Sequence, residues 1–343
     1  MRIGIVGYQG TGKSTVFELL TGVKPDIAKA HQGQVGIAIV PDERFDKLVE
    51  LYHPKKETPA RIELFDTPGL SRDDQSSNAQ RLGVIRESAA LVQVVGAFSG
   101  RDPVSEVDAF VTDLVLADLQ VVSNRIERLK KDITKPLPNR DELKAELESL
   151  QPLEARLSEG ETLHDMEFTE VQKKATRSFS LLSRKPHLVL LNTADADVDT
   201  KVVSTLEAKG MAVIAGPLGL ELEVAQLAED ERELFAEEMG LGEPSRERVL
   251  RAIFELTDMI TFYTCDEKEV HAWLLKKGSD AVEAAGSIHS DLARGFIRAE
   301  VQQVADLLRL GSEREVKAAG LHRTEGKDYI VQDGDELVIR FNV

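Results

Sequence analysis

The chain has 343 residues, long enough for two or three domains of about 100 to 200 residues each, which excludes a single small binding module. Hydrophobic residues make up 42% and charged residues 30%, values that argue against wholesale disorder and against a membrane-embedded fold. With 43 Lys and Arg against 60 Asp and Glu, the net charge is -17, so any contact with nucleic acid has to be made by a local basic patch.

The sequence contains one cysteine, Cys265, which excludes an intramolecular disulfide and a cluster of cysteine metal ligands. We expect Cys265 to be a small buried hydrophobic residue in a strand. Residues 1–14 lack the apolar region of a signal peptide, and no stretch approaches the roughly 20 apolar residues of a membrane helix. These features predict a cytoplasmic protein without membrane contact.

The first part of the chain alternates strand and helix patterns, as is typical of an α/β domain. Short apolar runs predict strands at 2–6, 35–40, 61–65 and 91–95, and a helix is expected over 14–20. From about 106 to 184 apolar residues recur at helical spacing, and a break at Pro136, Pro138 and Asn139 predicts an antiparallel pair of helices. Strands resume at 187–191 and 211–215, so the pair is an insertion in a mostly parallel sheet domain.

The rest of the chain predicts a separate, compact α+β module. Strands are expected at 260–263, 272–276 and 337–341, with turn signals such as Asp333-Gly334-Asp335 between them. The predicted domains are therefore the first part of the α/β domain at 1–105, the helical arm at 106–184, the second part of the α/β domain at 185–257 and the C-terminal module at 258–343.

Residues 7–14, Gly-Tyr-Gln-Gly-Thr-Gly-Lys-Ser, match the phosphate-binding pattern G-x-x-x-x-G-K-[ST] between an expected strand and an expected helix. The glycines let successive backbone amides face one anion, Lys13 can neutralise the outer phosphates, and the Ser14 hydroxyl can ligate Mg²⁺. The predicted nucleotide-binding residues of this segment are Gly7, Gly10, Thr11, Gly12, Lys13, Ser14 and Thr15.

Two further motifs follow strands of the same predicted sheet. In Asp66-Thr67-Pro68-Gly69 the aspartate can hold Mg²⁺ through water and the Gly69 amide can meet the terminal phosphate, although alone this sequence is equally well an ordinary turn. Asn192-Thr193-Ala194-Asp195 has the form N-x-x-D, in which the carboxylate accepts two hydrogen bonds that guanine supplies and adenine does not. We assign catalytic roles to Lys13, Asp66 and Gly69, metal binding to Ser14 and Asp66, and nucleotide binding also to Asn192, Asp195, Pro217 and Leu218.

The order of these motifs, the helical insertion and the C-terminal sequence together resemble the YchF/Obg-like ATPase family of translation-factor-class P-loop proteins. The segments that resemble the TGS domain of that family are KEVHAW at 268–273, AAGSIHSD at 284–291, GFIRAE at 295–300, EGKDYIVQDGD at 325–335 and FNV at 341–343. The resemblance covers essentially the whole chain. It implies a P-loop NTPase G domain with an inserted helical arm, a C-terminal TGS domain of ubiquitin-like fold, and a monomer that acts on GTP or ATP with Mg²⁺.

The sequence departs from the family pattern at the phosphate loop and at both switch segments. Gly10 replaces the asparagine expected to ligate potassium, the magnesium-binding threonine of switch I falls at Ala30, and residues 71–78 replace a glycine-rich stretch. Leu70 stands where typical GTPases have a water-orienting glutamine, which fits the hydrophobic substitution of the family, and no histidine occurs between His53 and His164 to replace that glutamine. The resemblance therefore implies slow intrinsic hydrolysis.

The base preference also departs from the family. Asp195 stands where family members carry a glutamate associated with the use of ATP, so the aspartate favours GTP, and ATP remains an alternative. Thr193 replaces a lysine whose stem covers the base in ordinary GTPases.

The leading hypothesis is a slow, Mg²⁺-dependent regulatory NTPase in which the terminal phosphate orders residues 66–70. Asp73 and Gln75 could orient water, but a solvated loop explains them better. The resemblance implies contacts with the ribosome or ribosomal RNA through the TGS domain and the helical arm. Four residues make the arm locally basic, which a solvated helix face explains equally well: Arg125, Arg128, Lys130 and Lys131.

Two rival functions remain open. A nucleotide-binding adaptor without useful hydrolysis is suggested by Ala30 and by the altered residues 71–78, whereas the intact Lys13, Ser14 and Asp66 argue against it. A small-molecule kinase with the same phosphate loop would leave the N-x-x-D motif and the TGS-like segments without a role.

Overall fold

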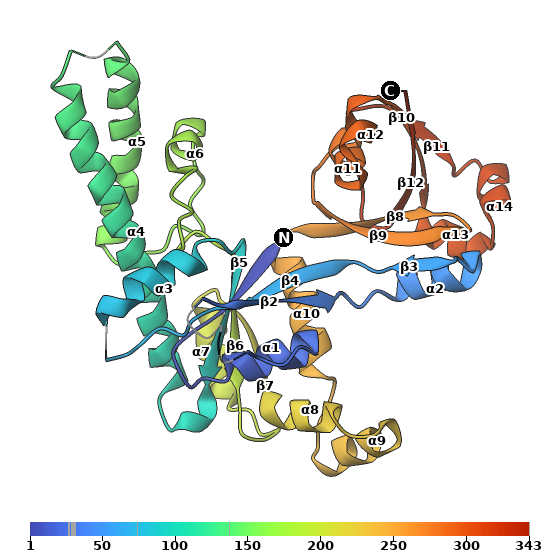
Figure 1. The fold of residues 1–343 in the computed structure, drawn as a ribbon, viewed down its shortest axis with the longest axis horizontal. Coiled ribbons are helices and arrows are strands. Elements are labelled where there is room, and N and C mark those ends of the chain that lie inside the picture. The colour runs from blue at the N-terminus through green and yellow to red at the C-terminus, as the bar shows by residue number, and fades with distance from the viewer. Residues whose placement is uncertain (27, 29–31, 74, 137, 343) are drawn as a thin grey trace. The chain divides into compact units, whose positions relative to one another are not determined.

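The computed structural model describes residues 1–26, 28, 32–73, 75–136 and 138–342 (Figure 1). The chain divides into two compact units, one formed by Met1–Gly36 with Glu63–Arg248 and the other by Ile37–Ile62 with Val249–Val343. Its strands form two six-stranded sheets, in the orders β2-β4-β1-β5-β6-β7 and β11-β10-β12-β8-β9-β3. The predicted α/β class is confirmed, while the four-part domain division stays a prediction.

The first sheet contains the strands expected from the short apolar runs. They are β1 (Arg2–Val6), β2 (Gln34–Ile39), β4 (Arg61–Asp66), β5 (Ala90–Gly96), β6 (His187–Asn192) and β7 (Ala212–Gly216). β1 pairs in parallel with β4 and β5, and β6 and β7 continue the parallel pairing beyond β5. Because the strands are parallel, the loops that follow β1, β4 and β6 leave the sheet at the same edge.

The helices of the first unit connect these strands. They are α1 (Lys13–Thr21), α3 (Asn78–Ile85), α4 (Pro103–Ile133), α5 (Arg140–Ser158), α6 (Glu170–Thr176), α7 (Thr200–Ala208), α8 (Leu218–Ala225) and α9 (Glu229–Glu238), and α10 (Ser245–Leu256) begins in this unit and runs into the second. Short 3-10 turns occupy Gln75–Ser77 and Ala97–Ser99. In the described part of the chain, no helix is long and apolar enough to cross a membrane.

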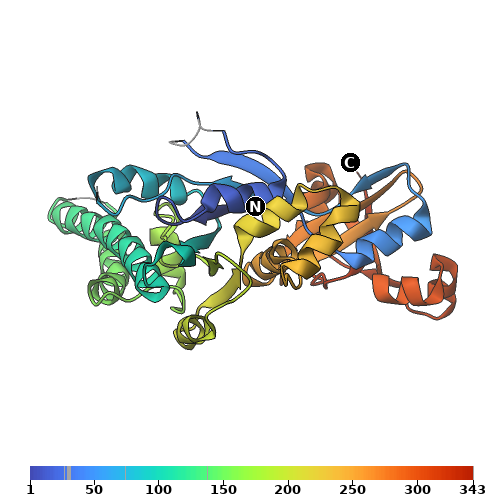
Figure 2. The same cartoon turned by 90° about the horizontal axis from the view of Figure 1, so that it is seen from below.

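Helices α4 and α5 form the expected helical pair and lie side by side (Figures 1 and 2). The start of α4 is set by Asp102, whose side chain accepts a hydrogen bond from the Ser105 amide, and by Pro103 in the first turn. Apolar residues at helical spacing form the buried seam of the pair, among them Val122, Ile126, Leu129, Leu150, Leu153 and Leu157. The predicted helical periodicity is therefore confirmed as the packing surface.

The second unit is a mixed sheet with helices. Its strands are β3 (Lys56–Thr58), β8 (Met259–Cys265), β9 (Glu269–Lys276), β10 (Phe296–Gln303), β11 (Arg323–Glu325) and β12 (Asp335–Phe341), and its helices are α2 (Glu43–Tyr52), α11 (Ala281–Ile288), α12 (Ser290–Arg294), α13 (Val304–Leu310) and α14 (Glu313–Ala318). The sequence predicts β8, β9 and β12, whereas β3, β10 and β11 were not expected. Cys265 lies in a strand as predicted, but it is half-buried rather than buried, because it is the last residue of β8.

Residues 37–62 belong to the second unit because specific contacts join them to its C-terminal part. β3 pairs in parallel with β9, with Thr58 opposite His271. Arg44 forms an ion pair with Asp333 at 2.7 Å, and the Tyr52 hydroxyl donates to Glu336 at 3.0 Å. A segment that lies between two strands of the first sheet in the sequence is thus built into the other unit.

Candidate functional site

The phosphate loop connects β1 to α1 through backbone conformations that favour glycine. Gly7 and Gly12 have φ angles of 132° and 97°. A Cβ atom at Gly7 would lie 2.5 Å from the Val94 carbonyl oxygen, and one at Gly12 would lie 2.3 Å from Nδ2 of Asn192. Both the φ angle and the close approach therefore require glycine at these two positions.

Lys13 is held inside the loop that its motif forms. Its side chain is 8% exposed, and Nζ donates to the Tyr8 carbonyl oxygen at 2.6 Å. The pKa of Lys13 is lowered to about 8, chiefly by burial; the charge of Asp66 opposes this effect, and the charges of Arg72 and Arg81 act with it. The phosphates of a nucleotide would place negative charge beside Lys13 and so favour its charged form.

Ser14 and Asp66 come together from different parts of the chain. Ser14 Oγ donates to Asp66 Oδ2 at 2.9 Å. The other carboxylate oxygen, Oδ1, is buried and accepts no hydrogen bond within the described residues. Burial raises the pKa of Asp66, whereas the bond from Ser14 and the charge of Lys13 lower it. A hydroxyl oxygen beside a carboxylate with an unused buried oxygen fits Mg²⁺, which prefers oxygen ligands.

The Asp66–Gly69 motif runs along the phosphate loop. The Leu70 amide donates to the Gly7 carbonyl oxygen and the Gln9 amide donates to the Leu70 carbonyl oxygen, both at 3.0 Å. A Cβ atom at Gly69 would lie 2.6 Å from Nζ of Lys13. The structure therefore brings together the three residues to which we assign catalytic roles, Lys13, Asp66 and Gly69.

Asn192 ties the third motif to the phosphate loop, but Asp195 lies apart from it. Asn192 is buried at the end of β6, and its Nδ2 donates to the Thr11 carbonyl oxygen at 3.3 Å. The Asp195 side chain is exposed, and its Oδ1 accepts a hydrogen bond from the Asp197 amide at 3.1 Å. This local turn therefore sets the present orientation of the carboxylate.

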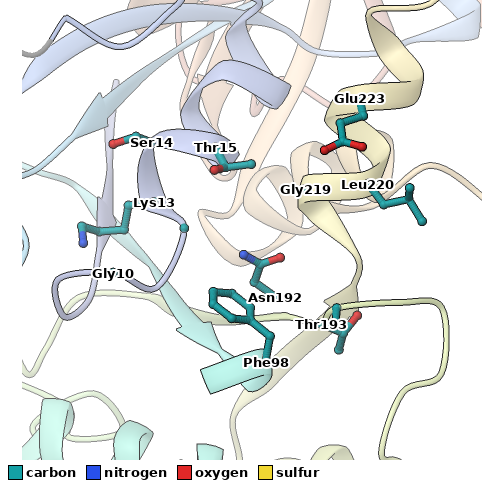
Figure 3. Close-up of a pocket in the computed structure, with 12 residues that line it drawn as sticks. Gly10, Lys13, Ser14, Thr15, Phe98, Asn192, Thr193, Gly219, Leu220 and Glu223 are labelled. Carbon is teal, nitrogen blue, oxygen red and sulfur yellow. The ribbon is translucent and has the colours of Figure 1, made fainter. Parts of the chain in front are cut away.

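A pocket of about 750 Å³ opens beside the loop (Figure 3). Phe98 lies beside Asn192, and Leu220 and Glu223 project from α8 in the same view. The predicted residues that line the pocket are Gly10, Gly12, Lys13, Ser14, Thr15 and Asn192. The remaining ones lie outside its lining, namely Gly7, Thr11, Asp66, Gly69, Asp195, Pro217 and Leu218.

Four residues that line this pocket belong to no sequence motif and were not predicted: Phe98, Gly219, Leu220 and Glu223. Phe98 lies in the 3-10 turn that follows β5, and the other three belong to α8, which follows β7. The available signal was their position after strands of the parallel sheet, since that edge is where such sheets bind ligands. Leu218, which we predicted instead, is 1% exposed and packs inward.

Some switch residues cannot be placed. Ala30 and the side chain of Gln75 lie outside the described part of the chain. Asp73 is exposed, as expected of a solvated loop residue.

The chain is similar to known proteins over its whole length. A family model described as a 50S ribosome-binding GTPase matches residues 2–125, and the model of the C-terminal region of YchF GTPases, described as a protein of unknown function, matches residues 259–342. The chain is 36% identical to the ribosome-binding ATPase YchF of Bacillus subtilis over 99% of both chains. It is 32% identical to Obg-like ATPase 1 of Oryza sativa, over 100% of this chain and 92% of that protein.

The fold has a solved counterpart in the YchF GTPase of Schizosaccharomyces pombe, with a TM-score of 0.82, 23% identity and coverage of 99% of this chain and 97% of that one. At this identity the likeness shows the fold alone. The full-length sequence matches add the family, so the resemblance found in the sequence is confirmed: the chain belongs to the YchF family of nucleotide-binding P-loop GTPases and ATPases.

Proposed function

We propose that the protein is a Mg²⁺-dependent purine nucleoside triphosphatase that hydrolyses its nucleotide slowly and works as a regulatory switch. The observation that carries the proposal is the meeting of Lys13, Ser14, Asp66 and Gly69 at the carboxyl edge of the sheet. Ser14 Oγ lies 2.9 Å from Asp66, whose second carboxylate oxygen is buried without a partner among the described residues. A merely structural loop gains nothing from such an orphaned oxygen, whereas a cation site uses it.

Each side chain has a distinct task in this proposal. The loop amides and the start of α1 bind the phosphates, and Lys13 neutralises the outer ones. Ser14 and Asp66 would hold Mg²⁺, which supplies further positive charge when bound. The Gly69 amide contacts the terminal phosphate and so orders the residues up to Leu70.

The slow turnover in this proposal follows from the apolar residue after Gly69, which is Leu70. Leu70 is fully buried and packs in an apolar cluster with Val6, Tyr8 and Leu82. An apolar side chain in this place cannot orient the attacking water as a glutamine does. Catalysis then rests on positioning and on charge stabilisation rather than on a general base.

We propose that GTP is the favoured nucleotide and that ATP is the alternative. The N-x-x-D form of residues 192–195 supports GTP. The relatives in Bacillus subtilis and Oryza sativa are named ATPases, which supports ATP. Competition of the two nucleotides for the purified protein decides between them.

We also propose the ribosome as the partner of a monomeric, cytoplasmic protein, on the ground that the Bacillus subtilis and Escherichia coli relatives are named ribosome-binding. Within the arm, Arg125 is bound to Glu146 by two hydrogen bonds of 2.7 Å, so it is poorly placed to contact RNA. Arg128, Lys130 and Lys131 are exposed on α4 and remain the candidate contacts.

The experiment that tests the proposal is nucleotide binding and single-turnover phosphate release with Lys13→Ala. We expect weaker binding and loss of hydrolysis, since the variant removes the buried cation of the loop. Lys201→Ala, which removes an exposed lysine of α7, is the matched control and should behave as the unmodified protein. Undiminished turnover in Lys13→Ala would refute the site, and binding without hydrolysis in the unmodified protein would favour the adaptor function.

A further inference from the structure

Arg72 lies against the phosphate loop although no motif includes it. It follows Gly69 by three residues, and its Nη1 donates to the Gln9 carbonyl oxygen at 3.1 Å. Its guanidinium carbon lies 4.6 Å from the centre of the Tyr8 ring, a cation–π distance. Arg72 thus contacts two consecutive residues of the loop.

The Arg72 side chain lines a neighbouring hollow together with Glu106, and its bond to Gln9 brings it near the groups that would surround the terminal phosphate, as far as the proposed function holds. A Cβ atom at Gly69 would lie 3.1 Å from the Gln9 nitrogen and 2.6 Å from Nζ of Lys13. Gln9, Gly69 and Lys13 therefore form one small neighbourhood, and Arg72 is bonded to the first of them. To contact that phosphate, Arg72 has to turn about its side-chain bonds from Gln9 toward Gly69 and Lys13.

A carboxylate of α4 holds Arg72 in its present position. The Arg72 guanidinium forms an ion pair with Glu106, whose side chain is only 9% exposed. Arg101 lies 3.8 Å from the same carboxylate but is itself 55% exposed. The shielded pair with Arg72 is the stronger of the two contacts, because solvent screens it less.

We propose that Arg72 is an in-chain arginine of the hydrolytic site, which leaves Glu106 to bind the terminal phosphate of the bound nucleotide. Glu106 is then its resting partner, and exchange between carboxylate and phosphate sets how fast the site becomes active. An arginine supplied within the same chain is a known way to stabilise the charge of phosphoryl transfer where no other group does so. Here it makes up in part for the apolar Leu70.

The reaction that Arg72 assists is ordinary hydrolysis. The oxygen of a water molecule bonds to the terminal phosphorus, the bond from that phosphorus to the bridging oxygen breaks, and the bridging oxygen keeps the electron pair. Both water protons depart on the released dihydrogen phosphate. Arg72 keeps its own protons and stabilises the negative charge that develops on the phosphate oxygens.

The electrostatics of the loop agree with this arrangement. The positive charge of Arg72 is among the causes that lower the pKa of Lys13, after burial. The positive charges of Arg72 and Lys13 repel each other in the protein alone, and the negative charge of a bound triphosphate would stabilise both.

The test compares Arg72→Ala, Arg72→Gln and Glu106→Gln with Arg101→Ala as the matched control. Single-turnover hydrolysis, the Kd for the nucleotide, and binding of the nucleoside diphosphate with aluminium fluoride are measured for each. We expect both Arg72 variants to hydrolyse at least about tenfold more slowly and to lose the fluoride complex, while the Kd for the nucleoside diphosphate, which lacks the terminal phosphate, changes less than about threefold. Glu106→Gln should hydrolyse faster, and Arg101→Ala should match the unmodified protein.

The opposite signs for Arg72 and Glu106 separate this role from a structural one, in which both variants would be impaired alike. Equal impairment of both, or an unchanged rate in the Arg72 variants, overturns the inference. If the unmodified protein binds nucleotide but does not hydrolyse it, the inference fails while the nucleotide site stands. If Lys13→Ala and the unmodified protein both fail to bind, the proposed function fails as well.

Discussion

Glu336 is a buried carboxyl group in the C-terminal unit whose charge should make stability depend on pH. It is 2% exposed and accepts hydrogen bonds from Tyr52 Oη at 3.0 Å and Gln302 Nε2 at 2.9 Å. Burial raises its pKa from 4.5 to about 7, against the effect of these two bonds, and the charge of Glu313 raises it too. Gln302 Oε1 is buried without a partner among the described residues, so a half-turn of this amide would let it accept a hydrogen bond from a protonated Glu336.

The sign of the effect follows from the raised pKa. The folded state binds the proton more tightly than the unfolded state, so this stabilisation is complete below the unfolded pKa and is lost as pH rises through the folded pKa. The difference between 4.5 and about 7 corresponds to a loss of about 3 kcal/mol, most of which falls between pH 5 and pH 8. Glu336→Gln keeps the shape and removes the charge, so its stability should lack this decline.

Urea unfolding of the full chain at pH 5, 6, 7 and 8 measures the difference. Trp273 is the only tryptophan, and it packs against the core of the C-terminal unit, so its fluorescence reports the unfolding of that unit. The His271 ring is stacked on Trp273 at 3.6 Å, but its titration is common to both proteins and cancels in the comparison. Glu315→Gln, which neutralises an exposed carboxylate of α14, is the control. Parallel pH profiles for Glu336→Gln and the unmodified protein would refute the reasoning.

Two further substitutions test the nucleotide site. Gly69→Ala places a Cβ atom 2.6 Å from Nζ of Lys13, so the loop or the lysine has to shift; we expect single-turnover hydrolysis to fall at least about tenfold with little change in Tm, and a rate within twofold of the unmodified protein would contradict this. Asp195→Glu should relax the preference toward ATP in competition binding, whereas an unchanged ratio of GTP to ATP affinity would show that Asp195 does not read the base.

The parts of the fold that the sequence predicts are those in which pattern and structure are local. The apolar run of β1, the glycines of the loop and the helix that begins at Lys13 follow one another within about 20 residues, so their spacing predicts them. β3 is different, because its three residues carry no periodic pattern and its partner β9 lies more than 200 residues away. Its strand conformation depends on that partner, which no local window contains.

The site divides in the same way. Lys13, Ser14 and Asp66 belong to motifs, and the parallel sheet brings them together as the order of the motifs predicts. Phe98 and Glu223 belong to no motif. They reach the pocket only because β5 ends at its edge and α8 begins there. The exposed Asp195 shows the converse, since the motif predicts its chemistry but the turn with Asp197 sets its orientation.

Arg72 illustrates why residue types in a loop do not predict their role. In the sequence it lies among polar residues that read as a solvated loop, and its partner Glu106 belongs to the first turn of a helix 34 residues later. A role for the Arg72 side chain can be inferred only from its ion pair with Glu106 and its hydrogen bond to Gln9. The effects of mutations at Arg72 and Glu106 on the rate of hydrolysis should therefore be non-additive, because the two residues contact each other. A double variant that hydrolyses as slowly as Arg72→Ala alone is what this dependence requires, since Glu106 has no effect once the arginine is absent.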